Sequence, residues 1–458
     1  MKNLWLLVAL VTIVSCTPKK KVDYAIISGK IENSTSKKAT IYSALDRDTK
    51  VEITLKDDGT FKDTLRMPTD FYLLRQDRSL TNFFAPKGSE IKITYNAKKK
   101  DSTLQFSGSE SEVNKYLLDK EKVTKEARGN AKEMYLKNET DFKEHLLKIK
   151  TVQENLFSST KEISGNYKKS ELKSINYQYL AALSKYQSYH GYYTKDKNFK
   201  VSGNYLEELK AVGLENENDF LFSENYRDVV KSILLNNANI LVKKDSIADD
   251  IAYLKTVAEI KNAKIKNKLL FDNAKYGITY TENLEEYYAL YSTNSTNNEN
   301  NKKILEVYQK LKALSKGSAS PKFSNYENND GKTTSLDDFK GKYVYLDIWA
   351  TWCGPCIAEI PSLKKIEKKY HNKNIEFVSI SVDRMKDHDK WKKLIIDKEL
   401  KGIQLFADNN WGSEFIQEYL IKGIPRFILI DPQGNIINAN APRPSENKLV
   451  EALKSFKL

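Results

Sequence analysis

The sequence predicts a multidomain protein, with an N-terminal antiparallel β domain, a central α-helical region and a C-terminal α/β domain. Its 458 residues are too many for one ordinary hydrophobic core. Short alternating apolar segments fill residues 24–109, and apolar residues at helical spacing fill residues 110–316. In residues 317–458, strand-like and helix-like segments alternate, which is typical of a mixed sheet covered on both faces.

The composition excludes two classes of protein. Hydrophobic residues make up 40% of the chain and aromatic residues 11%, which is enough for packed cores and excludes global disorder. The formal net charge of +14 comes from lysines and arginines that are spread along the whole sequence. A nucleic-acid-binding protein would concentrate its basic residues in one patch, so we expect no nucleic-acid partner.

Residues 1–15 predict a signal peptide. Lys2 supplies a basic start, and the apolar run Leu4–Val14 is shorter than the roughly 20 residues that a membrane-spanning helix needs. The last residues before Cys16 resemble a bacterial lipobox, which implies that Cys16 is acylated and that residues 16–23 form a lipidated tether. The alternative is an ordinary cleaved signal in which Cys16 is incidental.

Residues 24–109 predict a β-sandwich-like domain. Turn signals at Asp57–Gly59 and Pro86–Gly88 separate segments of alternating or clustered apolar residues. No group of polar residues in this region indicates catalysis, so we expect a spacer or a protein-binding module. The predicted strand segments are YAIISGKI, TIYSAL, VEITL, FYLLR, NFFAP, EIKITYN and TLQFS.

Residues 110–316 predict amphipathic helices without identifying a partner. Four tyrosines, at positions 186, 189, 192 and 193, could line a recognition surface, but packing between helices is the favoured interpretation. The apolar stripes that predict the helices consist of Val113, Tyr116 and Leu117; Leu146, Leu147, Ile149 and Val152; and Ile175, Tyr179, Leu180, Leu183 and Tyr186.

In the C-terminal domain, the small residues of Gly317–Pro321 predict a flexible hinge, and an Asp-Gly turn inside Phe323–Thr334 predicts a hairpin. Ser335 is placed to cap a short helix that runs to Phe339. The remaining predicted elements are strands at 343–349, 375–382, 426–430 and 435–439 and helices at 391–396 and 446–456.

The strand at 343–349 delivers Cys353 and Cys356 to the first turn of the next helix. Two cysteines three residues apart at this place satisfy the Cα separation of about 4.4 to 6.8 Å that a disulfide needs. Unpaired N–H groups and the helix dipole favour a thiolate at Cys353 and lower its pKa. We therefore expect Cys353 to be the nucleophile and Cys356 to resolve the mixed disulfide.

Two acids are candidates for taking the proton of Cys356. Asp347 lies in an otherwise apolar strand, where burial raises a carboxyl pKa, and Glu359 lies one helical turn after Cys356. Asp347 could instead be a structural acid, and Glu359 an ordinary solvated helix residue.

Two other uses of the cysteines are disfavoured. Zinc normally takes four ligands, whereas the third cysteine is Cys16 and the four histidines form no cluster, so we expect no metal. A peroxiredoxin needs a proline and a threonine before its cysteine, at positions where this chain has Leu346 and Ala350. We expect no other cofactor.

The segment around the cysteines contains Asp347, Trp349, Ala350, Trp352, Cys353, Gly354, Pro355, Cys356 and Pro361. With these residues at these positions, the segment resembles thioredoxin. Glu359 further resembles the glutamate of the Trp-Cys-x-Pro-Cys-x-x-Glu-x-Pro signature of the ResA and TlpA reductases. One departure is Ser379, which stands where thioredoxins often place a lysine near the buried aspartate.

Gly423–Arg426 is similar to the thioredoxin loop that carries a cis-proline beside the disulfide. If the bond before Pro425 is cis, the backbone of Ile424 can pair with an extended substrate, and Trp352 and Ile424 set its preference. Gly354 and Pro355 complete the expected substrate-binding set, and the resemblance associates them with reductases. The β segments likewise resemble the domain that precedes thioredoxin modules in many Bacteroidota lipoproteins.

Together these features predict a membrane-anchored, periplasm-facing thiol-disulfide oxidoreductase that reduces protein disulfides. The expected partners are disulfide-containing proteins, a membrane thiol-electron donor and the membrane itself, with the outer membrane favoured over the inner. A role in cytochrome c biogenesis is implied by the resemblance alone. The alternatives are a disulfide oxidase or isomerase, or a lipoprotein whose capture of a partner or ligand is redox-regulated.

Overall fold

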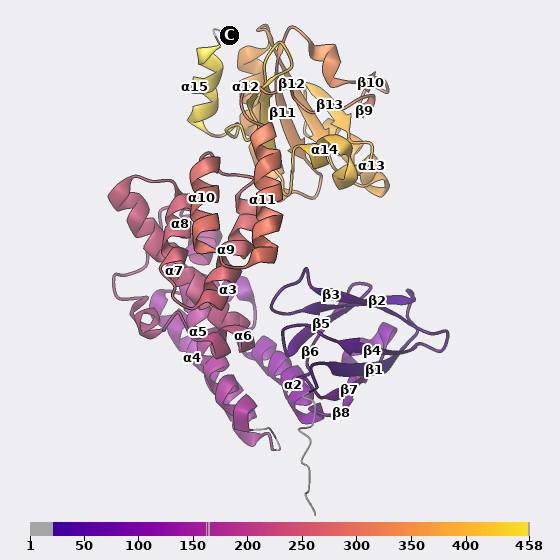
Figure 1. The fold of residues 1–458 in the computed structure, drawn as a ribbon, viewed down its shortest axis with the longest axis vertical. Helices are drawn as coiled ribbons and strands as arrows, with labels where there is room; N and C mark the ends of the chain where they lie inside the picture. The colour runs from indigo at the N-terminus through magenta and orange to yellow at the C-terminus, as the bar shows by residue number, and fades with distance from the viewer. Residues whose placement is uncertain (1–21, 162, 164, 457–458) are drawn as a thin grey trace, which may run out of the picture. The chain divides into compact units, whose positions relative to one another are not determined.

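The computed structural model describes residues 22–161, 163 and 165–456 (Figure 1). The predicted signal peptide and Cys16 lie outside these residues, as does most of the tether. The described chain forms two compact units, of which the first ends at Ile233 and the second begins at Leu234. None of the described helices has the length and apolar character that crossing a membrane requires.

The first unit begins with two four-stranded sheets, ordered β4-β1-β7-β8 and β3-β2-β5-β6. Alternate residues of their strands face a shared apolar core that includes Ile27, Ile41 and Phe83. All pairs are antiparallel except β1 and β7, which are parallel. Between these two strands the chain visits the second sheet twice and forms β4 of the first sheet in between. The strands are β1 (Ala25–Glu32), β2 (Lys38–Ser43), β3 (Lys50–Thr54), β4 (Thr60–Leu65), β5 (Phe71–Gln76), β6 (Ser79–Phe84), β7 (Glu90–Asn96) and β8 (Gln105–Gly108).

Helices follow the sheets, and the predicted stripe from Ile175 to Tyr186 is buried. The stripe predicted around residue 150 is partly wrong, because Leu147 and Val152 are exposed and Gln153 is buried in their place. The helices of this region are α1 (Lys100–Thr103), α2 (Ser111–Arg128), α3 (Ala131–Leu136), α4 (Glu139–Ser159), α5 (Gly165–Thr194), α6 (Glu217–Phe222) and α7 (Glu224–Asp245), with 3₁₀ helices η1 (Ala97–Lys99) and η2 (Glu207–Ala211).

The second unit opens with the end of α7 and four further helices. Ile251, Leu254, Leu269 and Leu270 are buried, as the amphipathic pattern of this region requires. The four helices are α8 (Asp249–Ala258), α9 (Ala263–Gly277), α10 (Leu284–Asn294) and α11 (Asn298–Ala313).

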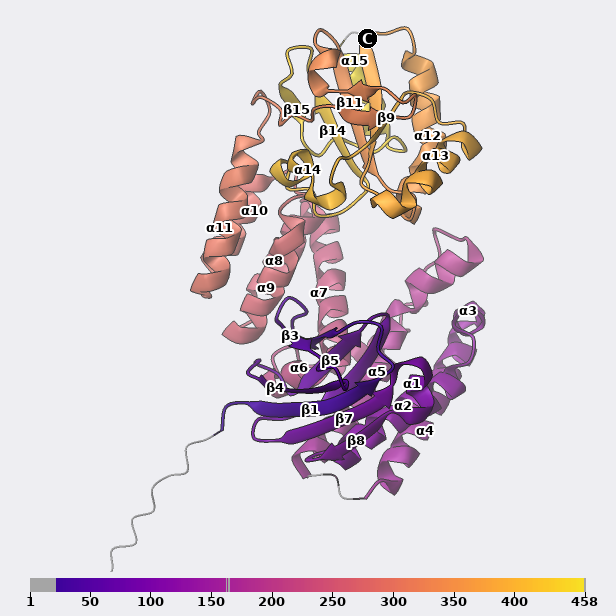
Figure 2. The ribbon, with the colours of Figure 1, turned by 90° about the vertical axis from the view of Figure 1, so that its right-hand side faces the viewer.

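A seven-stranded mixed sheet, ordered β10-β9-β13-β12-β11-β14-β15, forms the C-terminal domain, and the predicted fold class is confirmed (Figure 2). The sequence analysis did not predict the strand β13, the helix α14 or the short 3₁₀ helices η4 and η5. The strands are β9 (Tyr326–Asn328), β10 (Thr333–Thr334), β11 (Tyr343–Trp349), β12 (Ile375–Ser381), β13 (Ile403–Phe406), β14 (Arg426–Ile430) and β15 (Ile436–Asn438); the helices are α12 (Gly354–Tyr370), α13 (His388–Asp397), α14 (Glu414–Glu418) and α15 (Asn447–Ser455), with η3 (Leu336–Phe339), η4 (Met385–Asp387) and η5 (Asn410–Gly412).

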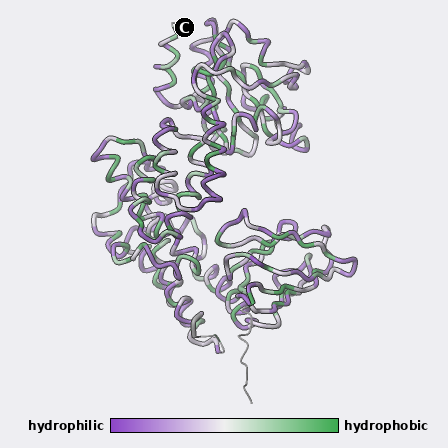
Figure 3. The backbone as a smooth tube through the Cα atoms, in the orientation of Figure 1, coloured by the Kyte–Doolittle hydropathy of each residue, from purple (hydrophilic) through white to green (hydrophobic). Residues whose placement is uncertain are grey.

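Each face of this sheet is covered by its own helices. Tyr345 and Phe427 pack against α12 and α15, whereas Leu346 and Ile428, their neighbours in sequence, pack against α13 and α14. This alternation is the pleat of a strand that is buried on both sides. Figure 3 shows the resulting concentration of hydrophobic residues along the strands of this domain.

The prediction of a flexible hinge at Gly317–Pro321 is wrong. The Gly317 N–H donates to the Ile436 carbonyl at 2.8 Å, and the Ile436 N–H donates back to the Ser318 carbonyl at 2.8 Å. The Ser320 N–H donates to the Gly434 carbonyl at 3.0 Å. Small residues here allow close backbone pairing with the β14–β15 turn, so this segment is fixed to the edge of the sheet.

Candidate active site

Cys353 and Cys356 form a disulfide at the start of α12, with their Cα atoms 5.3 Å apart. Cys353 is the N-cap residue of the helix, and its Sγ accepts a hydrogen bond from the Cys356 N–H at 3.1 Å. An N-cap acceptor sits where the orphan N–H groups and the positive end of the helix dipole converge. The pair therefore has the geometry that the sequence predicted, and the structure is that of the oxidised protein.

The surface around the disulfide is formed by exposed neighbours. Both cysteines are only 4% exposed, whereas Trp352 is 54% exposed. Gly354 and Pro355 are exposed as well. Access to the sulfur atoms therefore depends on the residues that surround them, which are those that the sequence assigned to substrate binding.

Asp347 lies on β11, directly opposite Ser379 of β12 in the parallel ladder. The Ser379 hydroxyl donates to Asp347 Oδ2 at 3.5 Å, the limit of a hydrogen bond, so it compensates little for burial. Burial raises the pKa of Asp347 to about 7, with smaller contributions from the charges of Glu367 and Glu359. Asp347 can therefore exchange a proton near neutral pH.

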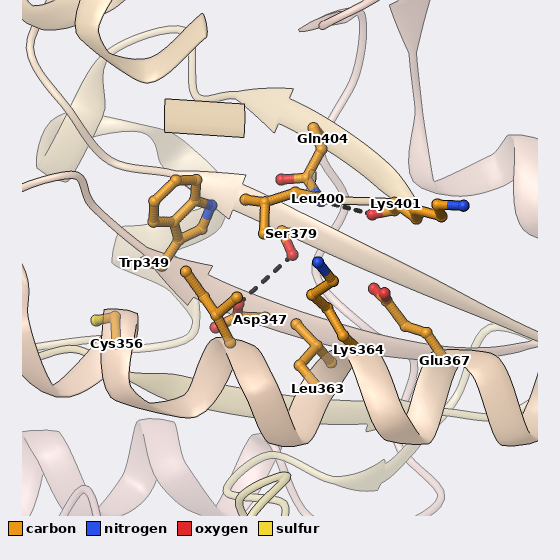
Figure 4. A pocket seen from close by; sticks show the side chains of 11 residues that line it. Asp347, Trp349, Cys356, Leu363, Lys364, Glu367, Ser379, Leu400, Lys401 and Gln404 are labelled. Atoms are coloured by element: carbon orange, nitrogen blue, oxygen red, sulfur yellow. Dashed lines mark hydrogen bonds between the residues drawn. The ribbon is translucent and has the colours of Figure 1, made fainter. Parts of the chain in front are cut away.

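Asp347 and Cys356 line one small pocket (Figure 4). The pocket has a volume of about 10 Å³, close to the smallest space that holds one water molecule. Lys364 and Gln404 also contribute to its wall. The structure thus brings the predicted resolving cysteine and the predicted proton acceptor to a common cavity.

Glu367 is a member of this site that the sequence analysis missed. It lines the same pocket, and burial raises its pKa to about 7 despite the opposing charge of Lys364. Figure 4 shows Cys356, Leu363 and Glu367 along one side of α12. The spacing in the sequence could have revealed Glu367. It lies seven residues after the apolar Ile360, which is about two helical turns, so both residues are on the same face of the helix.

Glu359 is 8% exposed, so the alternative of a solvated helix residue is wrong. Its Oε2 accepts from the Ser445 N–H at 3.0 Å and its Oε1 from the Ser445 hydroxyl at 2.9 Å. Arg443 lies 3.9 Å from Oε1. These contacts tie α12 to the segment before α15, a structural task that the sequence did not reveal.

Asp383 is a second residue that the sequence analysis missed. Its carboxylate is fully buried and accepts from the Thr351 N–H at 2.8 Å and the Thr351 hydroxyl at 2.9 Å. The Ser381 hydroxyl donates to it at 2.8 Å. Asp383 therefore holds the turn that precedes Cys353 against the end of β12.

The Gly423–Arg426 loop lies at the same end of the sheet as the disulfide. Arg426, the first residue of β14, is paired with Ile348 near the end of β11, from which the chain continues to Cys353. The Ile424–Pro425 peptide bond is cis, and Pro425 is buried. Ile424 packs against the apolar cluster that contains both cysteines.

Comparisons with known proteins place similarity in the C-terminal domain. The Redoxin family model matches residues 315–453. The thiol-disulfide oxidoreductase ResA of Bacillus cereus is 30% identical over 157 residues, which cover 32% of this chain and 83% of that protein. ResA of Bacillus subtilis is 26% identical over 153 residues, which cover 33% of this chain and 81% of that protein.

Solved structures with similarity to this chain cover the same region. The thioredoxin domain of a Bacteroides vulgatus thiol-disulfide oxidoreductase is 31% identical, with a TM-score of 0.29, and covers 31% of this chain and 98% of its own. A thiol-disulfide oxidoreductase of Bacteroides fragilis is 30% identical, with a TM-score of 0.28, covering 30% and 99%.

Proposed function

Because the chain belongs, through its C-terminal domain, to the ResA-like thiol-disulfide oxidoreductases, we propose that it reduces protein disulfides at the cell envelope. The observation that carries this proposal is the Cys353–Cys356 pair at a helix start, with Asp347 in the pocket of Cys356. An N-cap thiolate, a resolving thiol and an acid with a pKa near neutrality are the parts that thiol-disulfide exchange requires.

The reaction begins with the reduced protein. The Cys353 thiolate attacks one sulfur of a substrate disulfide, so that a Cys353–substrate bond forms while the other substrate sulfur leaves and takes a proton. Cys356 gives its proton to ionised Asp347 and attacks the Cys353 sulfur. The mixed disulfide breaks, and the second substrate sulfur leaves as a thiolate that takes the proton held by Asp347. Two electrons have then passed from the protein to the substrate; one proton came from Cys356 through Asp347, and the other came from solvent, which had received the proton of Cys353.

Asp347 is suited to the second step because burial raises its pKa to about 7. At a pH of about 7 the Asp347 carboxyl is therefore ionised in about half of the molecules. A general base works best when its pKa lies near the operating pH. Glu359 is the second candidate acceptor, but its oxygens already accept from Ser445. We therefore assign the proton transfer to Asp347.

Substrate contact falls to the exposed rim of the site. Trp352, Gly354 and Pro355 offer an open surface beside the sulfurs, and the backbone of Ile424 can pair with an extended segment. The oxidised protein must then be recharged by a dithiol donor. A lipid anchor at Cys16 would hold the protein at the cell envelope, facing the periplasm and within reach of a membrane thiol-electron donor. Of the two membranes, we favour the outer one.

The reduction potential of the pair tests the direction of electron flow. The protein used is the full chain with Cys16→Ser. This substitution removes one of the three cysteines and leaves Cys353 and Cys356. The protein is equilibrated in graded dithiol buffers and its free thiols are trapped. A potential of about −270 mV supports a reductase, whereas a value of about −120 mV would indicate that the protein is an oxidase.

A trapping experiment tests the assignment of the two cysteines. Cys356→Ala, which lacks the resolving thiol, is expected to accumulate mixed disulfides with envelope proteins. Cys353→Ala is the matched control and should accumulate none. Equal trapping by both variants would contradict the role of Cys353 as the nucleophile.

A further inference from the structure

The segment between α9 and α10 packs on the Gly423–Arg426 loop. The Arg426 guanidinium donates through Nη2 to the Thr279 carbonyl at 2.6 Å and lies 4.5 Å from the centroid of the Tyr280 ring. The phenol of Tyr280 reaches Gly423, where an added Cβ would come within 2.5 Å of its oxygen. Two residues of the helical region thus contact both ends of the loop.

Asn440 completes this arrangement from the segment after β15. Its side-chain N–H donates to the Tyr280 carbonyl at 2.7 Å, and its Oδ1 accepts from Arg426 Nη1 at 2.7 Å. Arg426 is only 2% exposed and Thr279 5%. A buried guanidinium with carbonyl, amide and aromatic partners fixes the position of Tyr280 relative to the loop.

Tyr280 itself remains accessible. Its side chain is 37% exposed, and its contacts are with Gly423 and Arg426, which flank Ile424 and Pro425. Ile424 stays half-buried. The ring therefore stands beside the part of the loop where a substrate segment would pair, and it leaves that part open.

We propose that Tyr280 is a specificity-determining residue that contacts the polypeptide on one side of the substrate disulfide, and that Arg426 and Asn440 are its positioning residues. This inference rests on the proposed function. A tyrosine supplies a large, rigid contact with a polar end, which suits the varied side chains of an unfolded polypeptide. A small disulfide has no flanking polypeptide, so it lacks the segment that the ring is proposed to contact.

The test compares two substrates of the reduced full chain carrying Cys16→Ser. One is a short unfolded peptide with one disulfide, and the other is oxidised β-mercaptoethanol. Tyr280→Ala is expected to lower the second-order rate constant for the peptide about fivefold, the size of one good aromatic contact. The rate constant for oxidised β-mercaptoethanol should not change.

Two further variants separate contact from folding. Tyr280→Phe keeps the ring and should retain most of the peptide rate, whereas Asn440→Ala should lower the peptide rate in part. Tyr276→Ala is the matched control, because Tyr276 is a tyrosine of the same region that is 48% exposed and whose ring contacts the Lys275 ammonium. It should behave as the parent chain.

The outcomes distinguish this proposal from the proposed function. The deciding quantity is the rate constant for the peptide divided by that for oxidised β-mercaptoethanol. If Tyr280→Ala leaves this ratio unchanged or increases it, the role of Tyr280 is overturned, while the proposed oxidoreductase function stands. A parent chain that reduces neither substrate would overturn the proposed function, and this inference with it.

Discussion

At the scale of single residues, the ionisation of Asp347 links stability to chemistry. An aspartate ordinarily has a pKa of about 3.9, whereas burial raises the pKa of Asp347 to about 7. Between these values the folded protein binds a proton that the unfolded chain has released. The free energy of unfolding therefore falls as the pH rises through this window.

Asp347→Asn removes this dependence. At pH 8 the variant is expected to be more stable than the parent by about 2 to 4 kcal/mol, and at pH 4 the two should differ little. Denaturant unfolding of the oxidised proteins at both pH values measures the difference. Asp119→Asn, at an exposed carboxylate in the middle of α2, is the control and should change stability little. An equal stability gain at both pH values would contradict the assigned pKa.

Glu367 affects the same proton. Its negative charge contributes to the raised pKa of Asp347, so Glu367→Gln should lower that pKa. The pH dependence of mixed-disulfide resolution should shift toward acid by about half a unit, typical of a nearby like charge. Single-turnover kinetics across pH measure this shift, with the exposed Glu418→Gln as control. An unchanged profile would show that Glu367 is not coupled to Asp347.

At the scale of elements, strands and helices with clear apolar periods could be predicted from the sequence. β11 and β14 have the predicted bounds, because each is a continuous apolar run between polar turns. β13 has only four residues, IQLF, too short a run to separate from a loop. The exposure of Leu147 depends on which face of α4 meets α5, and that is decided by tertiary packing.

The candidate site divides in the same way. The placement of Cys353, Cys356 and Asp347 at one site could be predicted because all three lie in one continuous segment of the sequence. Asp383 and Glu367 could not, because their partners come from elsewhere in the fold or lie two turns along a helix. Pro425 was predicted through the resemblance, whereas the contacts of Tyr280 join residues far apart in the sequence.

Asp383 also allows a prediction about how the active-site turn is held. Asp383→Ala leaves the Thr351 N–H and two hydroxyls without their acceptor, which should lower the free energy of unfolding by about 2 to 4 kcal/mol. Denaturant unfolding measures the loss. Asp383→Asn keeps one acceptor oxygen and should lose less. If Asp383→Ala and Asp383→Asn lower the free energy of unfolding equally, hydrogen bonds to Asp383 do not hold the turn, and the shape of the side chain does.

At the scale of the whole molecule, the proposed anchor makes a simple prediction. Cys16→Ser removes the only thiol that could be acylated at the predicted lipobox, so the protein should move from the membrane fraction to the soluble fraction. Fractionation and immunoblotting measure this change. Cys353→Ser is the matched control and should stay with the membrane. A Cys16→Ser protein that remains bound would contradict a lipid anchor.

The packing of Thr279 on Arg426 bears on any truncation of this protein. The matched family region starts at residue 315, so a fragment excised at Gly317 keeps the sulfur chemistry and the paired edge of its sheet. It loses the Thr279 carbonyl and the Tyr280 ring, and a guanidinium that is 2% exposed in the intact chain becomes open to solvent. Such a fragment is a sound surrogate for measuring potentials and a poor one for ranking substrates.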